Sequence, residues 1–168
     1  MCGGGSERAQ RQVIPPTVQA FCRYISDKTP TVLLDLLRPT ATDDGRAYQL
    51  LALERAGVTV EQVGEVQAGY NLSDQQLLDL LSINRRTLQR RRSKQEPLSA
   101  GDSANFLEVA RLLSFASEVF GDDEKVKRWI RRPNAALGHE TPLQLMATST
   151  GRGLVHDIIG RIAHGVFA

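Results

Sequence analysis

The chain has 168 residues, of which 41% are apolar, 24% are charged and 5% are aromatic, and its formal net charge is +2. This length allows one domain or two small domains, and the scarcity of aromatic residues favours helices packed on helices over a sheet-rich fold. Two cysteines are too few for a four-cysteine zinc site or a dense disulfide framework, and no apolar run is long enough to span a bilayer.

The amino-terminal segment, MCGGGSERAQRQ, lacks the apolar stretch of a secretion signal. The low cysteine content, Cys2 and Cys22, fits a reducing compartment. We therefore expect a cytoplasmic protein that does not associate with membranes. Residues 1–14 are expected to form a disordered tail, which ends at Pro15 and Pro16.

Short helical patterns follow this tail. In the stretch TPTVLLDLLRP, Thr29 can cap a helix, Pro30 suits its first turn and Pro39 stops it. Farther along, Gly57 stands where the carboxyl-terminal glycine of a helix belongs. The helices expected in this region lie within residues 18–25, 29–39, 43–58 and 59–71.

The stretch LSDQQLLDLL has the clearest helix start in the chain. Ser73 and Gln76 have the spacing of a capping box, and Leu72 and Leu77 can form a hydrophobic staple around it. Asn84 can cap a second helix through RRTLQRRRSK. Two short helices joined by a turn of about three to four residues form a helix-turn-helix motif. Its small core is expected to consist of Leu77, Leu81, Ile83 and Leu88.

The second of these helices concentrates positive charge. Residues 85–94 hold six of the 21 basic residues and no acid, whereas acids outnumber bases in the rest of the chain. A local basic cluster is typical of an anion-binding surface, although a solvated basic face on a structural helix has the same composition. Because the cluster directly follows a capped, leucine-rich helix, we favour contact with DNA.

The first turn of the basic helix carries the side chains suited to reading bases. With Leu88 inward, Arg85, Arg86 and Gln89 lie near the end that helix-turn-helix proteins insert into the major groove. Arginine suits the acceptor pair of guanine, and glutamine suits the donor and acceptor of adenine. The later basic residues are expected to hold phosphates. The predicted DNA contacts are Arg85, Arg86, Gln89, Arg90 and Arg92.

The turn before this helix has Ser82 where such turns often have glycine. Serine adopts fewer backbone conformations than glycine, so we expect a degenerate helix-turn-helix. A connection around Pro97 then divides the chain into residues 15–97, which include the helix-turn-helix, and residues 98–168.

The second part also has helical patterns and no alternating strand, so the predicted fold is all-α. A long helix is expected over residues 103–120, and Asp122 can cap the next one. Thr141, Pro142 and Gln144 form a capping box with a first-turn proline. A final helix begins near residue 153. Its expected core stripe contains Leu154, Ile158, Ile162 and Val166, widened by Val155 and Ile159.

Residues 115–166 carry an ordered set of motifs. These are Phe120-Gly121-Asp122, Trp129, Asn134 with Leu137-Gly138, Thr141-Pro142-Leu143, Thr148 with Gly151, and Arg161 with His164-Gly165-Val166. In order and spacing this set resembles the toxin-binding domain of the Xre/MbcA/ParS antitoxins. The preceding part resembles the Xre-like region of the same family, so the resemblance extends over roughly residues 30–168. Gly138 and Gly151 are expected at turns that need unusual backbone angles.

The resemblance implies a type II antitoxin that pairs with a RES-domain toxin, an enzyme that consumes NAD. Such an antitoxin obstructs the entrance to the toxin's active site, commonly with its carboxyl-terminal segment, and the complex binds its own promoter DNA. It further implies a homodimer and a higher hetero-oligomer with the toxin. The expected toxin contacts are Arg161, His164, Gly165, Val166, Phe167 and Ala168.

Nothing in the sequence points to an enzyme. There is no glycine-rich phosphate loop with its lysine, and the three histidines lack partners at metal-ligand spacing. We therefore expect no cofactor, no metal and no catalytic residue. The alternative functions are a stand-alone helix-turn-helix repressor whose carboxyl-terminal half only dimerises, and a small helical enzyme.

Overall fold

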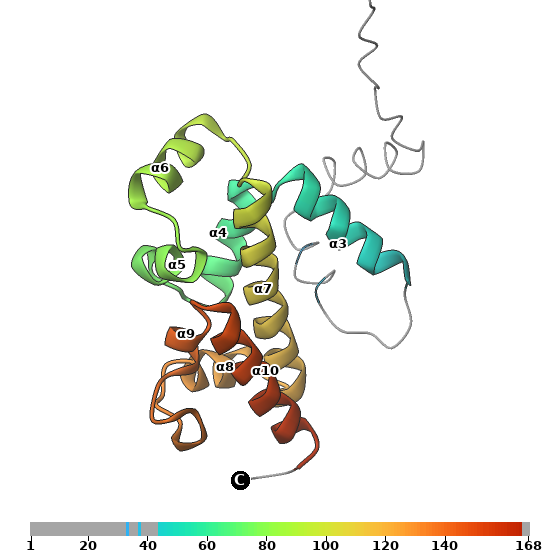
Figure 1. The fold of residues 1–168 in the computed structure, drawn as a ribbon, viewed down its shortest axis with the longest axis vertical. Coiled ribbons are helices and arrows are strands. Elements are labelled where there is room, and N and C mark those ends of the chain that lie inside the picture. Colours follow the sequence, from blue (N-terminus) through green and yellow to red (C-terminus); the bar gives the residue numbers. More distant parts are fainter. Residues whose placement is uncertain (1–32, 34–36, 38–43, 166–168) are drawn as a thin grey trace, which may run out of the picture.

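The computed structural model describes residues 44–165 together with Leu33 and Leu37, and the side chains of this range from residue 50 onward. Within these residues the fold is all-helical, with no strand, which confirms the predicted class (Figure 1). The predicted tail at residues 1–14 and the helix expected over residues 18–25 lie outside the described residues, as do Val166, Phe167 and Ala168.

The described helices follow one another with short connections. In chain order they are α3 (Asp44–Ala56), α4 (Val60–Gly69), α5 (Asp74–Leu81), α6 (Arg85–Lys94), α7 (Ala100–Phe120), α8 (Asp123–Trp129), the 3₁₀ turn η1 (Ala135–Leu137), α9 (Pro142–Leu145) and α10 (Ser149–Ala163). Figure 1 shows α7 as the central helix, with α3 on one side. The helices α4 to α6 lie along its first part, and α8 to α10 lie around its second part.

The hydrophobic core follows α7 from one end of the molecule to the other. The helices α3, α5, α8 and α10 all pack against α7, and their buried side chains form a continuous cluster. This cluster is largely aliphatic, as the composition predicts. Its most deeply buried members include Leu33, Leu77, Leu81, Phe106, Leu113, Val126, Ile130 and Ile159.

Capping residues define the helix starts as the sequence predicts. At α5 the Ser73 side chain accepts from the Gln76 backbone N–H, and the Gln76 side chain accepts from the Ser73 backbone N–H. The same reciprocal pair joins Thr141 and Gln144 at α9. A capping box satisfies two backbone donors that would otherwise have no partner in the helix.

Two of the predicted helices differ from the structure. The helix α7 begins at Ala100, capped by Ser99, rather than at residue 103. Ser103, which the sequence had placed at the helix start, is fully buried, and its hydroxyl accepts a hydrogen bond from the Val58 backbone N–H at 2.9 Å. The helix α10 begins at Ser149, one turn earlier than expected.

The predicted core stripe of α10 is partly wrong. Leu154 is 48% exposed, whereas Val155, Ile158 and Ile159 are buried. Positions four residues apart are rotated by about 40° from one another in a helix of 3.6 residues per turn. A strict four-residue stripe therefore turns away from the core, and its first member, Leu154, falls on the exposed side.

Candidate nucleic-acid interface and carboxyl-terminal surface

The turn between α5 and α6 has the backbone conformation that glycine usually supplies at the end of a helix. Ser82 adopts φ 54° and ψ 34°, the left-handed conformation. The Ser82 N–H donates to the Asp79 carbonyl, and the Ile83 N–H donates to the Leu78 carbonyl at 3.3 Å. The expected small core forms below this turn, because Leu77, Leu81 and Leu88 are buried and Ile83 is partly buried.

The first turn of α6 presents unpaired positive charge. The Asn84 side chain accepts from the Thr87 backbone N–H at 2.8 Å, which sets the helix start. Arg85 is exposed; its guanidinium donates to the neutral Gln75 side chain at 3.4 Å, and its charge also interacts with the Asp74 carboxylate. Arg86 and Gln89 are exposed and contact no hydrogen-bonding or ionic partner in the described part of the chain.

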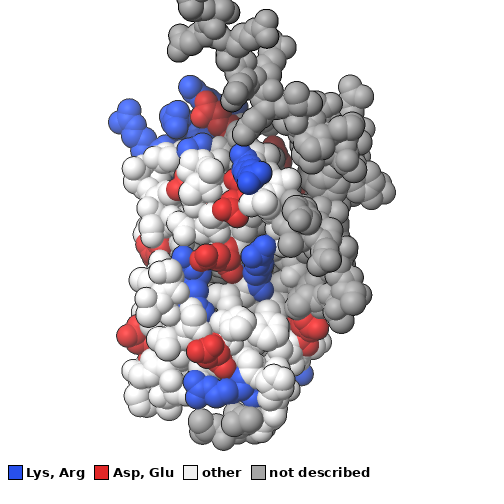
Figure 2. Space-filling model, turned by 45° about the vertical axis from the view of Figure 1, so that its right-hand side comes forward, with Lys and Arg blue, Asp and Glu red and all other residues white. Residues whose placement is uncertain are grey.

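The last turn of α6 is different, because acidic residues of the same chain face it. Arg90 and Lys94 both approach Glu96, at 3.5 and 3.9 Å. Arg91 lies 3.8 Å from Asp102 and also donates to the Pro97 carbonyl. Figure 2 shows basic side chains, with an acidic one among them, gathered at one end of the molecule; elsewhere on this face the two signs alternate.

Arg92 makes the most extensive contacts of the predicted DNA-binding residues. One guanidinium nitrogen donates to Asp74 Oδ1 at 3.1 Å, and the other donates to Gln67 Oε1 at 2.7 Å. Gln67 and Arg92 both hydrogen-bond the Asp74 carboxylate, and they hold the pKa of Asp74 below its usual value. The structure thus directs Arg92 towards α4 and α5, away from the exposed side of α6 that carries Arg86.

The carboxyl-terminal surface is the exposed end of α10. Arg161 and His164 are both exposed there, and neither side chain pairs with another residue that the structure describes. His164 ends the helix, with its N–H donated to the Gly160 carbonyl. Gly165, directly after this residue, has φ +66°, the left-handed conformation that favours glycine.

Comparisons with known proteins bear on both surfaces. Residues 49–117 match the family model of an antitoxin Xre-like helix-turn-helix domain. Residues 116–165 match the model of the antitoxin Xre/MbcA/ParS C-terminal toxin-binding domain. The antitoxin Xre of Yersinia enterocolitica is 30% identical over 134 residues, which cover 79% of this chain and 90% of that protein. The chain belongs to the Xre antitoxin family.

Other antitoxins are similar over much of their length. The antitoxin Xre of Photorhabdus laumondii is 30% identical over 118 residues, covering 70% of this chain and 80% of that protein. A protein of Sphingobium named Prs ADP-ribosylating antitoxin is 26% identical over 123 residues, covering 68% of this chain and 77% of that protein. The antitoxin therefore combines a helix-turn-helix domain, with α5 and α6, and a toxin-binding domain, with α8 to α10.

The two family models meet at residues 116–117, inside α7. Arg131, after α8, also joins the two regions, because it donates to the carbonyls of Tyr70 and Asn71 in the α4–α5 turn at 3.0 and 2.6 Å. The division between residues 97 and 98 predicted from the sequence stays a prediction.

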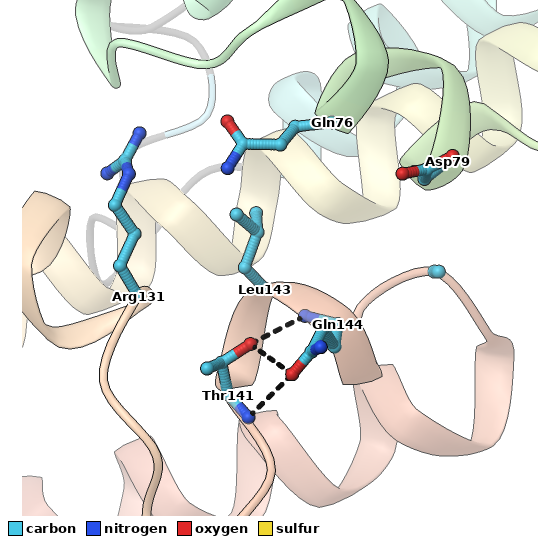
Figure 3. Close-up of a pocket in the computed structure, with 7 residues that line it drawn as sticks. Gln76, Asp79, Arg131, Thr141, Leu143 and Gln144 are labelled. Atoms are coloured by element: carbon cyan, nitrogen blue, oxygen red, sulfur yellow. Dashed lines mark hydrogen bonds between the residues drawn. The ribbon is translucent and has the colours of Figure 1, made fainter.

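A groove of about 550 Å³ lies between α5 and α9. Figure 3 shows Gln76 extending from α5 towards Leu143, with Arg131 at one side and the Thr141–Gln144 capping box below. The capping boxes of α5 and α9 use the side-chain oxygens of both glutamines. The walls of the groove are thus formed in part by the first turns of two helices, α5 in one matched region and α9 in the other.

Arg152 is a structural residue that the sequence analysis missed. It is buried, and it donates to Glu108 Oε2 at 2.6 Å, to Asn105 Oδ1 at 3.2 Å and to the Met146 carbonyl at 3.1 Å. The bonds to Glu108 and Asn105 attach α10 to α7, and the bond to Met146 attaches it to the end of α9. The available signal was its spacing of three and seven residues from Val155 and Ile159, which places Arg152 on the buried face.

The expectation for the two turn glycines is half right. Gly138 has φ +67°, as a turn glycine should. Gly151 instead lies within α10, where an added Cβ would overlap the backbone carbonyl of Leu145. Gly151 is therefore needed for close packing of the α9–α10 turn, and not for an unusual backbone angle.

Among the described residues, no three histidine, cysteine or acidic side chains gather in a way that could hold a metal ion. Nor does any helix in that part of the chain have the length and apolar character of a membrane span.

Proposed function

We propose that the antitoxin neutralises a RES-domain toxin that consumes NAD, and that its carboxyl-terminal segment obstructs the entrance to the toxin's active site. We further propose that it acts in the cytoplasm by binding rather than catalysis, as a homodimer and in a larger complex with the toxin. Through the helix-turn-helix it represses its own operon.

The observation that carries the toxin-binding proposal is the free end of α10. Arg161 and His164 stand on the last turn, exposed and unpaired within the described residues. Val155 and Ile159 anchor the helix in the core, so it presents this turn as a rigid support. A preorganised support lowers the entropy that binding costs. One similar protein is named for ADP-ribosylation, a reaction that takes its ADP-ribose from NAD, which supports the choice of toxin.

Co-expression tests this half of the proposal. The antitoxin should restore growth of cells that express the toxin encoded beside it, and the two proteins should co-purify. Deletion of residues 165–168 should weaken the rescue and leave the helix content unchanged in circular dichroism. Deletion of residues 2–5, of equal length, serves as the control. Full rescue by the carboxyl-terminal deletion contradicts obstruction by this segment.

The DNA-binding half rests on the first turn of α6. Arg85, Arg86 and Gln89 are exposed close together there, and neither arginine forms an ion pair with an acidic residue of the described chain. Arg90 and Lys94 add to this surface, because their pairs with Glu96 are exposed. Exposed ion pairs contribute only about 0–1 kcal/mol, so a phosphate can replace Glu96 at small cost.

The double variant Arg85→Ala with Arg86→Ala should abolish binding to DNA from the upstream region and spare toxin neutralisation. Arg128→Ala with Arg132→Ala is the matched control, since both side chains are exposed and lie in the other matched region. Affinity should fall with salt at a logarithmic slope of about 0.9 per phosphate contact. Equal loss in the two double variants would refute the assigned surface. Repression without any toxin complex would favour a stand-alone repressor.

A further inference from the structure

Gln67, Asp74 and Arg92 form a closed network of three hydrogen bonds. Arg92 donates to both other side chains, as described above, and Gln67 Nε2 donates to Asp74 Oδ1 at 2.8 Å. The three residues come from α4, α5 and α6, and they lie 7 to 25 positions apart in the chain. Each side chain thus holds the other two, and α6 is tied to both preceding helices.

This network attaches α6 to α4 and α5 at a point one turn beyond its buried leucine. Leu88 is the buried residue of α6. Arg92 lies four residues after Leu88, and the capping residue Asn84 lies four residues before it, so all three share the inward face of the helix. Arg91 connects α6 to the residues that follow it, through Asp102 and the Pro97 carbonyl. The bonds of Arg92 instead fix the direction of α6 relative to α4 and α5.

Arg92 is the basic residue of α6 that is bonded to both α4 and α5, whereas Arg91 contacts Asp102 and the Pro97 carbonyl, which follow α6 in the chain. Arg90 and Lys94 each reach one acidic residue at 3.5 Å or more, and Arg86 reaches no partner in the described residues. The contacts of Arg92, at 2.7 and 3.1 Å, are shorter and involve two different helices. A phosphate bound at Arg92 would therefore compete with Asp74 and Gln67 for the N–H donors of the guanidinium.

We propose that Arg92 is a positioning residue, which acts with Gln67 and Asp74 to aim the first turn of α6 at the major groove, rather than a phosphate contact. The proposal rests on the DNA-binding half of the proposed function, and it replaces the phosphate-contact role that the sequence had suggested for Arg92. Base recognition then depends on three side chains that do not contact the DNA.

Variants of the two partners separate the alternatives. Gln67→Ala changes no charge, and Asp74→Asn removes a negative charge close to the basic helix. If Arg92 is a positioning residue, both variants weaken recognition. If Arg92 binds phosphate, Gln67→Ala is neutral and Asp74→Asn tightens binding, because it frees a cation and removes repulsion. The matched control is Glu61→Gln, which removes a first-turn acid from α4 that lies outside the network.

The experiment measures affinity of the full-length variants for two duplexes, one from the region upstream of the protein's own coding sequence and one of random sequence. Gln67→Ala, Asp74→Asn and the charge-preserving Arg92→Lys should each weaken binding to the upstream duplex by about three- to tenfold. Binding to the random duplex depends on charge, so it should change less than about twofold for Gln67→Ala and Arg92→Lys, which preserve charge, and should not weaken for Asp74→Asn. The salt slope should stay at its wild-type value.

A purely structural defect would lower affinity for both duplexes and impair toxin neutralisation as well, and that result would overturn the positioning role. Unchanged or tighter binding of the upstream duplex by Gln67→Ala and Asp74→Asn would overturn it too. If the wild-type protein fails to distinguish the duplexes, the DNA-binding function fails instead. In that case amide hydrogen exchange tests whether the network holds α6 in place. Exchange of the α6 amides should be faster in Gln67→Ala than in the wild-type protein, and it should be unchanged in Glu61→Gln. Unchanged exchange in Gln67→Ala would refute the proposal.

Discussion

Replacement of Gly151 by alanine should destabilise the protein, whereas the same replacement two residues later should stabilise it. Both glycines lie in α10. At Gly151 the added Cβ would overlap the Leu145 carbonyl and lie 2.9 Å from Thr148 Oγ1. At Gly153 no atom lies within 4 Å of the added Cβ. The pair therefore separates helix propensity from packing in a single helix.

The magnitudes follow from this geometry. Alanine is favoured over glycine inside a helix by about 0.5–1 kcal/mol, and Gly153→Ala should gain that amount. Gly151→Ala has the same gain, but overlap with backbone costs about 1–3 kcal/mol. It also disturbs the bond from the Gly151 N–H to Thr148 Oγ1, a cap worth about 1 kcal/mol. The net loss is about 2 kcal/mol.

Thermal and urea unfolding of the full-length variants, followed by far-ultraviolet circular dichroism, measures this difference. At about 2–4 °C per kcal/mol for a chain of this size, Tm should fall by about 4–8 °C for Gly151→Ala. It should rise by about 1–4 °C for Gly153→Ala. If Gly151→Ala is as stable as Gly153→Ala, the close approach of the α9–α10 turn is not a packing constraint and the reasoning is refuted.

Three further substitutions test single interactions by urea unfolding. Arg152→Met should cost about 2–3 kcal/mol, because the buried Met146 carbonyl loses its donor; a cost below about 0.5 kcal/mol would contradict this. Ser82→Gly should gain about 0.5–1 kcal/mol, since glycine adopts φ 54° without strain, and a loss would count against it. Burial and the Glu61 charge raise the pKa of Glu65, so the folded state binds this proton more tightly than the unfolded state and stability rises as pH falls towards the raised pKa. Glu65→Gln should remove that dependence and stabilise the protein at neutral pH. If the free energy of unfolding of the variant varies with pH as that of the wild-type protein does, Glu65 is not the cause of the dependence.

Much of the local structure could be predicted because its causes lie within a few residues. The capping boxes at Ser73 and Thr141 each join residues three apart, so their spacing is visible in the sequence. The helix-turn-helix core depends on leucines at helical spacing, which any helix would place on one face. The family resemblance rests on the order of short motifs, and the comparisons confirm it.

The interactions of individual charged residues and glycines could not be predicted from the sequence, because they depend on how the helices pack against one another. Arg86 and Arg92 stand in one basic run, yet Arg86 is exposed and Arg92 bonds to residues 18 and 25 positions away. Arg152 likewise depends on Glu108, 44 positions earlier. Gly151 is constrained by the neighbouring turn, and Leu154 is exposed because of how α10 is rotated on the core.

The sequence by itself thus determined the all-helical class, the starts of the helices with clear capping signals, such as α5 and α9, and the family, since capping, periodicity and motif order are local properties of the chain. Only the tertiary structure decided which arginines are free for a partner and which hold helices together. An arginine has the same charge wherever it stands, and the acceptors within its reach are set by the packing of helices that are distant in sequence.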